Sequence, residues 1–101
     1  MPTYLVDRTI PGLTRDQFRA AQRALGHAAQ RAAEPGCRVR YLRALFVPSE
    51  GRAVCVFEAP DAASVRAVNQ SAGVPFSCVV EALDLIAEPD HFPEEGRCAY
   101  S

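Results

Sequence analysis

Residues 38–59, RVRYLRALFVPSEGRAVCVFEA, decide the fold of this chain. Residues 38–47 and 52–59 are rich in apolar, β-branched and aromatic side chains, and the turn-forming stretch PSEG at 48–51 separates them. Two such runs joined by a short turn predict a β-hairpin. If Val47 pairs with Arg52, one hairpin face is wholly apolar, and we expect helices to cover that face. It comprises Leu42, Ala44, Phe46, Ala53, Cys55 and Phe57.

A strand and a helix are predicted before the hairpin. Residues 3–8 are rich in strand formers and stop before Pro11-Gly12. Thr14 and Gln17 then have the spacing of a capping box, and apolar residues recur at helical spacing as far as Ala33. The sequence therefore predicts a long amphipathic helix between the first strand and the hairpin.

A second helix and a last strand are predicted after the hairpin. Asp61 is the expected N-cap of this helix, and Gly73 is the expected residue just beyond its end. Residues 77–87 are dense in Val, Leu and Ile and predict the final strand. The order strand, helix, strand, strand, helix, strand is that of the ferredoxin-like α+β fold, with two helices on one face of a four-stranded antiparallel sheet.

The opposite sheet face is expected to be open and mixed in character. It carries Tyr41, Arg43, Leu45, Val54, Val56 and Glu58. Exposed apolar surface of this kind is a liability for a monomer. We therefore expect a homodimer in which two such faces meet, an association of the dimeric α/β-barrel type that encloses a cavity.

Composition limits the chain to one domain and excludes two kinds of partner. The 101 residues are 49% hydrophobic and 23% charged, a composition ordinary for a globular protein. We expect one domain at residues 1–87. Residues 88–101 are acidic and rich in proline, and we expect a tail there. A net charge of −1 provides no electrostatic footprint for nucleic acid. No apolar run has the length that a membrane-spanning helix needs.

The cysteines and the N-terminal residues favour a reducing compartment. The four cysteines are spaced without any CxxC pair, and residues 1–8 contain no secretory signal. We therefore expect free thiols and a cytoplasmic location, with Cys55 packed as a small hydrophobic residue under the helices.

The candidate catalytic residues lie on the open face. Tyr41, Arg43 and Glu58 project from the hairpin, and we expect Glu81 and Asp7 to join them from the neighbouring strands. In a partly dry dimer cavity, these carboxylates could have raised pKa values suited to proton transfer. Arg43 and Tyr41 would then orient a small organic ligand and stabilise charge on it. The alternative is an arginine–glutamate pair that holds the strand register or the dimer interface.

Three short motifs resemble the DUF4242 family, which includes small cytoplasmic nickel-binding proteins. These are MPTYLVDR at 1–8 with IPG at 10–12, CVFEAPD at 55–61, and GVP at 73–75 with VVE at 79–81. The resemblance implies a ferredoxin-like subunit, a dimer and nickel as a ligand. At two positions where family members often carry histidine, this chain has Arg43 and Val68, neither of which can bind a metal. The residues themselves therefore predict no metal site and no cofactor.

Three function classes follow. The first is a small-molecule-binding dimer, with cofactor-independent cyclase or isomerase chemistry as its enzymatic form. The second is a nickel-binding protein, as the resemblance implies. The third is a binding or scaffolding module without chemistry.

Overall fold

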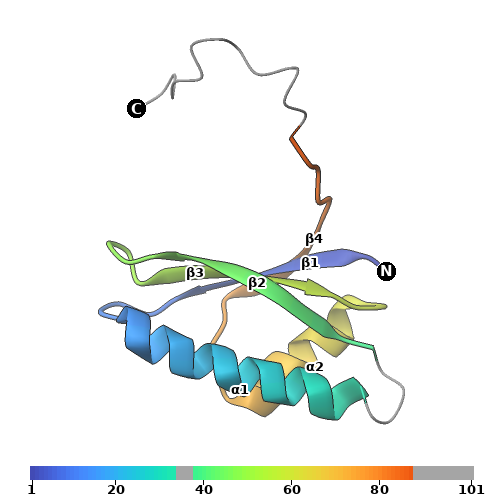
Figure 1. Ribbon diagram of the computed structural model, residues 1–101, viewed down its shortest axis with the longest axis horizontal. Helices are drawn as coiled ribbons and strands as arrows, with labels where there is room; N and C mark the ends of the chain where they lie inside the picture. The colour runs from blue at the N-terminus through green and yellow to red at the C-terminus, as the bar shows by residue number, and fades with distance from the viewer. Residues whose placement is uncertain (34–37, 88–101) are drawn as a thin grey trace.

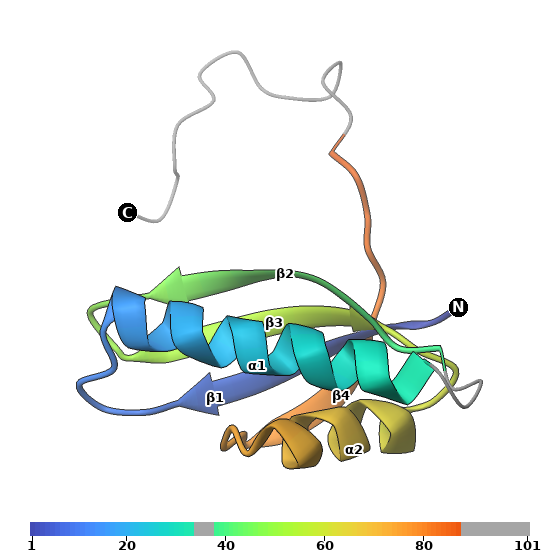
Figure 2. The same ribbon diagram turned by 60° about the horizontal axis from the view of Figure 1, so that its bottom comes forward.

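The computed structural model describes residues 1–33 and 38–87. The elements are β1 (Thr3–Thr9), α1 (Arg15–Ala33), β2 (Arg40–Val47), β3 (Arg52–Glu58), α2 (Ala62–Ala72) and β4 (Cys78–Ala82). The strands form one antiparallel sheet in the order β2-β3-β1-β4. Both helices cover the same face of this sheet, as Figures 1 and 2 show. The predicted ferredoxin-like α+β fold is confirmed, whereas the expected tail at 88–101 lies outside the described residues.

The predicted helix caps are confirmed. The Gln17 amide donates to Thr14 Oγ1 at 3.1 Å, and the Thr14 amide donates back to Gln17 Oε1 at 3.0 Å. The Asp61 carboxylate accepts from the Ser64 amide at 2.8 Å. Gly73 ends α2 with φ of 71°, in the left-handed region where glycine is favoured.

The core lies between the helices and the covered sheet face. Phe18, Leu25 and Ala28 of α1 are buried against it, as are Val65 of α2 and Phe57 of β3. Small alanines along α1 allow the helix to approach the sheet closely. The Cys55 side chain is fully buried in this layer, as predicted.

A β-bulge in β2 reverses the expected facing of one candidate residue. Val47 pairs with Arg52 as predicted, but the register shifts between Tyr41 and Arg43. Tyr41 therefore lies opposite Phe57, and the two rings stack with centroids 4.8 Å apart. The prediction that Tyr41 shares a face with Arg43 is wrong, because an extra residue in a strand breaks the strict alternation of faces.

Alternation along β1 resolves the facing of this strand. Tyr4, Val6 and Arg8 are buried toward the helices, and the residues between them point to the open face. Asp7 therefore lies on the open face, as expected. Glu81 pairs with Tyr4 and so lies on the helix side, at the exposed edge strand β4, which corrects its predicted place.

The last strand is shorter than predicted. β4 ends at Ala82, which pairs with Thr3, the first residue of β1. Residues 83–87 lie beyond the last paired residue of β1 and extend away from the sheet (Figure 1). We call residues 83–87 the arm. Its apolar side chains are exposed, with Leu83 and Leu85 at 81% and Ile86 at 89%.

Candidate functional site

The open face of the sheet is the face that the helices leave bare. It carries Thr3, Leu5, Asp7, Arg43, Leu45, Val54, Val56, Glu58, Cys78 and Val80. Three of the predicted site residues, Asp7, Arg43 and Glu58, lie on it. Tyr41 and Glu81 do not, so the structure does not gather the proposed acid–base set on one surface.

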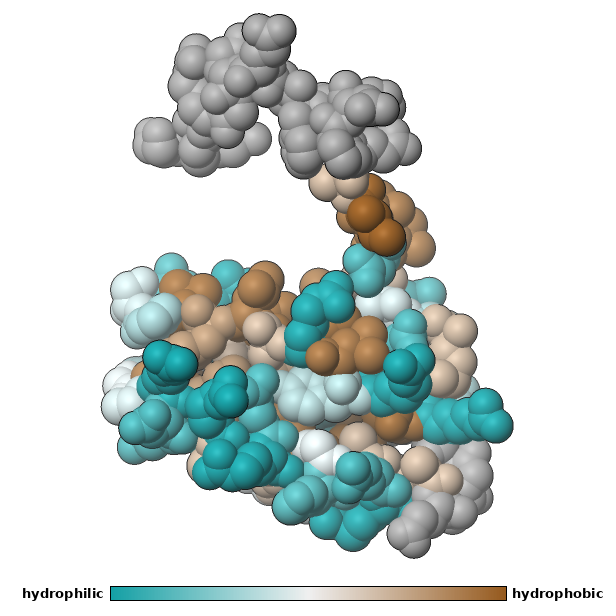
Figure 3. Space-filling view, in the orientation of Figure 1, coloured by the Kyte–Doolittle hydropathy of each residue, from teal (hydrophilic) through white to brown (hydrophobic). Residues whose placement is uncertain are grey.

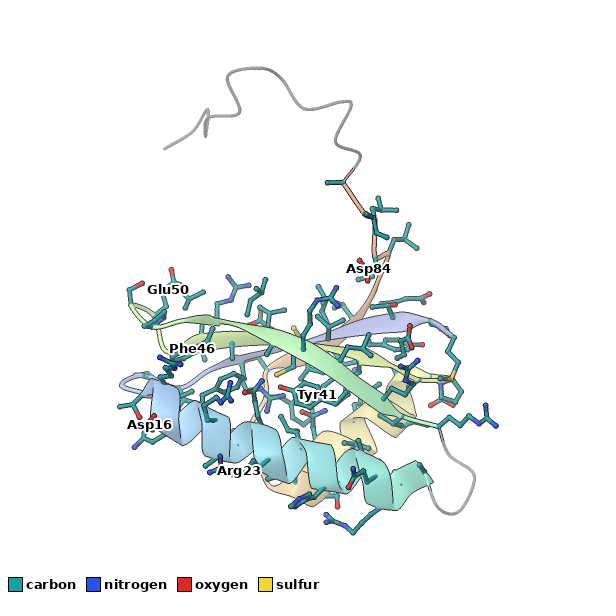
Figure 4. All side chains as sticks on the ribbon, viewed as in Figure 1. Asp16, Arg23, Tyr41, Phe46, Glu50 and Asp84 are labelled. Atoms are coloured by element: carbon teal, nitrogen blue, oxygen red, sulfur yellow. The ribbon has the colours of Figure 1, made fainter. Side chains whose placement is uncertain are left out.

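Arg43 lines a small hollow on the open face. Its Nη2 donates to Asp84 Oδ2 of the arm at 3.2 Å. The hollow has a volume of about 130 Å³ and is lined by Thr3, Leu5, Arg43, Val56, Ala82, Leu83 and Asp84. Asp84 was not among the predicted site residues, because the sequence placed it inside the expected strand at 77–87 and no motif marked it as a partner of Arg43. Figure 4 shows Asp84 on the arm, just after the end of β4.

Glu58 and Asp7 are engaged in ion pairs of their own. Glu58 Oε1 accepts from Arg40 Nη1 at 3.0 Å, so the arginine that forms an ion pair with Glu58 is Arg40 and not Arg43. Arg52 forms a bidentate ion pair with Asp7, in which Nη2 donates to Oδ2 at 2.9 Å and Nε donates to Oδ1 at 3.2 Å. The hydrogen bond from Arg52 holds the pKa of the Asp7 carboxyl below its usual value. In the single chain this shift is opposite to the raised pKa that proton transfer at neutral pH needs, and a raised pKa of Asp7 inside a dimer cavity stays a prediction.

Tyr41 belongs to a polar contact beneath the sheet. Its hydroxyl accepts from Gln22 Nε2 of α1 at 3.1 Å and donates to Cys55 Sγ at 3.5 Å. Burial raises the pKa of Tyr41, and the hydrogen bond to Cys55 adds to the shift. Figure 4 shows Tyr41 between β2 and α1. The phenol therefore links helix to sheet as a neutral group.

The described residues do not form a metal centre. Residues 1–33 and 38–87 contain no group of three or more histidine, cysteine, aspartate or glutamate side chains that could hold an ion. Arg43 is ion-paired on the open face, and Val68 is buried on the other side of the sheet. His27 is exposed on α1 and Cys78 is exposed and free. Cys37, Cys98 and His91 lie outside the described residues.

The comparisons with known proteins identify the family. The chain matches the family described as "Nickel responsive protein SCO4226-like" over residues 4–82. The chain belongs to this family. In the crystal structure of SCO4226 from Streptomyces coelicolor A3(2), a chain of 27% identity superposes with a TM-score of 0.67, covering 84% of this chain and 99% of that one. None of the curated proteins compared with this chain matches it.

The family assignment changes the order of the function classes. It supports the predicted resemblance to nickel-related proteins, whereas the DUF4242 label itself stays a prediction. Neither the family nor the match to SCO4226 supports a cyclase or isomerase. Among the described helices, none is long and apolar enough to span a membrane.

Proposed function

We propose that this chain works as a homodimeric, nickel-responsive binding protein. Membership of the SCO4226-like family is the observation that carries the proposal. The scattered positions of Tyr41, Glu81 and Glu58 support binding over acid–base catalysis, because such catalysis needs its groups within reach of one substrate.

The dimer part of the proposal rests on the open face and the arm. Leu45 on this face is 70% exposed, and the arm adds three more exposed apolar side chains. Figure 3 shows hydrophobic residues along the arm, hydrophobic and hydrophilic residues mixed over the strands, and mostly hydrophilic residues over α1. Burying one such leucine contributes about 1.5–3 kcal/mol. A second copy offers both surfaces that are needed, an open face for the arm and an arm for the open face.

The metal part requires donors beyond one described chain. The described residues of a single copy do not fit a nickel centre, since nickel prefers imidazole and other nitrogen or sulfur ligands. Donors for nickel would come from a second copy, or from positions such as His91 and Cys98 outside the described residues. Among the described donors, the Cys78 thiol is free and exposed and lies on the open face.

Two measurements test the two parts separately. Light scattering after size exclusion is expected to give the mass of a dimer, and a monomer at micromolar concentration rejects the dimer. Equilibrium dialysis against Ni²⁺ followed by elemental analysis is expected to show retained nickel. A His91→Ala/Cys98→Ser variant is expected to retain less nickel than His27→Ala, whose histidine is exposed on α1. No retained nickel in the full chain rejects the metal part and leaves the dimer result standing.

A small organic ligand in the dimer cavity is the second candidate. The hollow lined by Arg43 favours it, because a guanidinium in the lining of a partly apolar recess can hold a carboxylate. Calorimetric titrations with Ni²⁺ and with small carboxylic acids test this candidate. Heat of binding for Ni²⁺ but none for any of the acids would reject an organic ligand. Unchanged ligand affinity in Arg43→Ala and Glu58→Gln variants would show that these residues do not hold the ligand.

A further inference from the structure

Arg8 is a buried cation without a carboxylate partner among the described residues. Its side chain is 1% exposed, beneath the sheet on the helix side. The adjacent carboxylate, Asp7, points to the opposite face, where Arg52 holds it. No ion pair joins Arg8 to any described acidic residue, and burying an unpaired charge is costly.

Neutral groups satisfy only part of the Arg8 guanidinium. Nη2 donates to Asn69 Oδ1 at 2.6 Å, and Nη1 donates to the Pro75 carbonyl at 3.3 Å. Asn69 Nδ2 donates to the Val65 carbonyl at 2.8 Å, which fixes the amide with its oxygen toward Arg8. Arg8 Nε is buried and has no partner. An arginine has five N–H donors in all, so this guanidinium retains donor capacity.

A cavity adjoins this arginine. Its volume is about 240 Å³, and it is lined by Arg8, Thr9, Pro75, Phe76 and Ser77. The loop that forms one wall is held on β1, because the Ser77 amide donates to the Asp7 carbonyl at 2.7 Å. Ser77 adds a hydroxyl-bearing side chain to the lining, whereas the alternation along β1 turns the Thr9 side chain to the open face, so that Thr9 lines the cavity through its backbone. A positive charge, a hydroxyl donor and a fixed loop together match the chemistry of a small oxyanion.

We propose that this cavity, the Arg8 cavity, binds a small oxyanion such as a phosphate or carboxylate group. The anion supplies the missing countercharge and accepts from the guanidinium and from the Ser77 hydroxyl. The Arg8 cavity lies on the helix side of the sheet, so it is independent of the open face and of nickel. The competing interpretation is that Arg8 only ties β1 to the loop after α2.

The test uses inorganic phosphate and acetate as probes on the full chain. Thermal unfolding and calorimetry are run in phosphate, acetate and chloride at matched ionic strength. Phosphate or acetate is expected to raise the unfolding midpoint above that in chloride. The acetate and phosphate arms distinguish a carboxylate ligand from a phosphoryl ligand. Equal midpoints in all three salts overturn the proposal.

Variants separate specific binding from general charge effects. Arg8→Met is expected to abolish the anion response, and Arg19→Met, which removes an exposed arginine from α1, is expected to keep it. Because Arg8→Met changes the core, Ser77→Asp provides a second variant that attaches a carboxylate to the cavity wall. Ser77→Asp is expected to raise the midpoint in chloride and to weaken phosphate binding by about tenfold or more. Ala20→Asp adds the same charge on α1; an equal loss in that control overturns the proposal.

Discussion

Arg43 on β2 and Asp84 on the arm are joined by a hydrogen-bonded ion pair of 3.2 Å. This ion pair connects the open face to the arm. Both side chains are about half exposed, so the pair alone adds little stability. Its effect is to hold the start of the arm beside the open face, with the apolar residues Leu85 and Ile86 beyond it.

The arm is expected to control dimerisation more than folding. Leu85→Asp and Ile86→Asp place charges on side chains that are more than 80% exposed in the single chain. Because these side chains contact little in one copy, we expect the free energy of unfolding of the monomer, measured in urea at a protein concentration low enough to dissociate the dimer, to change by less than about 0.5 kcal/mol. Sedimentation is expected to show weaker dimers, whereas Ala20→Asp on α1 leaves them intact. Unchanged dimers in both arm variants contradict the proposed interface.

Loss of the Tyr41 hydroxyl is expected to destabilise the domain. Tyr41→Phe keeps the stack on Phe57 but removes the hydrogen bonds to Gln22 and Cys55, which costs about 1 kcal/mol. The folded-state pKa of Tyr41 is raised, so the folded chain binds this proton more tightly than the unfolded chain. Wild-type stability should therefore fall as pH rises above the ordinary tyrosine pKa of about 10, and less so in Tyr41→Phe. Urea midpoints at about pH 8 and pH 11 test this.

The Asp7–Arg52 pair is expected to contribute to acid sensitivity. The folded-state pKa of Asp7 is lowered by the hydrogen bond from Arg52, so its stabilisation is present above the unfolded value and is lost as pH falls. Because the pair is partly exposed, we expect less than about 1 kcal/mol at neutral pH. Asp7→Asn should lose less stability than wild type between about pH 7 and pH 3. Parallel pH curves for the two proteins contradict this account.

Two glycines are expected to respond in opposite directions to alanine. Gly51 ends the hairpin turn with φ of 62°, and a Cβ there would overlap the Ile10 carbonyl. Gly51→Ala should therefore destabilise by about 2 kcal/mol or more. Gly26 lies within α1 with open space around its Cα, so Gly26→Ala should stabilise by about 0.5–1 kcal/mol. Chemical unfolding of the two variants measures both changes in the free energy of unfolding. Equal changes in Gly51→Ala and Gly26→Ala would show that backbone strain is absent at Gly51.

Much of the fold follows from local patterns in the chain. The continuous apolar run at residues 53–57, the Thr14–Gln17 capping box, the Asp61 cap and Gly73 each act within a few residues, so each could be predicted. The Val47–Arg52 register follows from the length of the turn. Element order then leads to the layer arrangement, because a one-sided apolar sheet needs helices on that side.

The candidate site depended on facts that no local pattern carries. A bulge of one residue turned Tyr41 from the open face to the core, and no Gly or Pro in β2 marks it. β4 stopped at Ala82 because its neighbour β1 offers no partner beyond Thr3, which turned residues 83–87 from strand into arm. Arg8 is a buried cation because alternate residues of β1 share a face, so Arg8 points to the helix side together with Tyr4 and Val6. The sequence by itself determined which elements form, through short-range hydrogen bonding and periodicity, whereas only tertiary pairing decided which charged side chains meet and which stay unpaired.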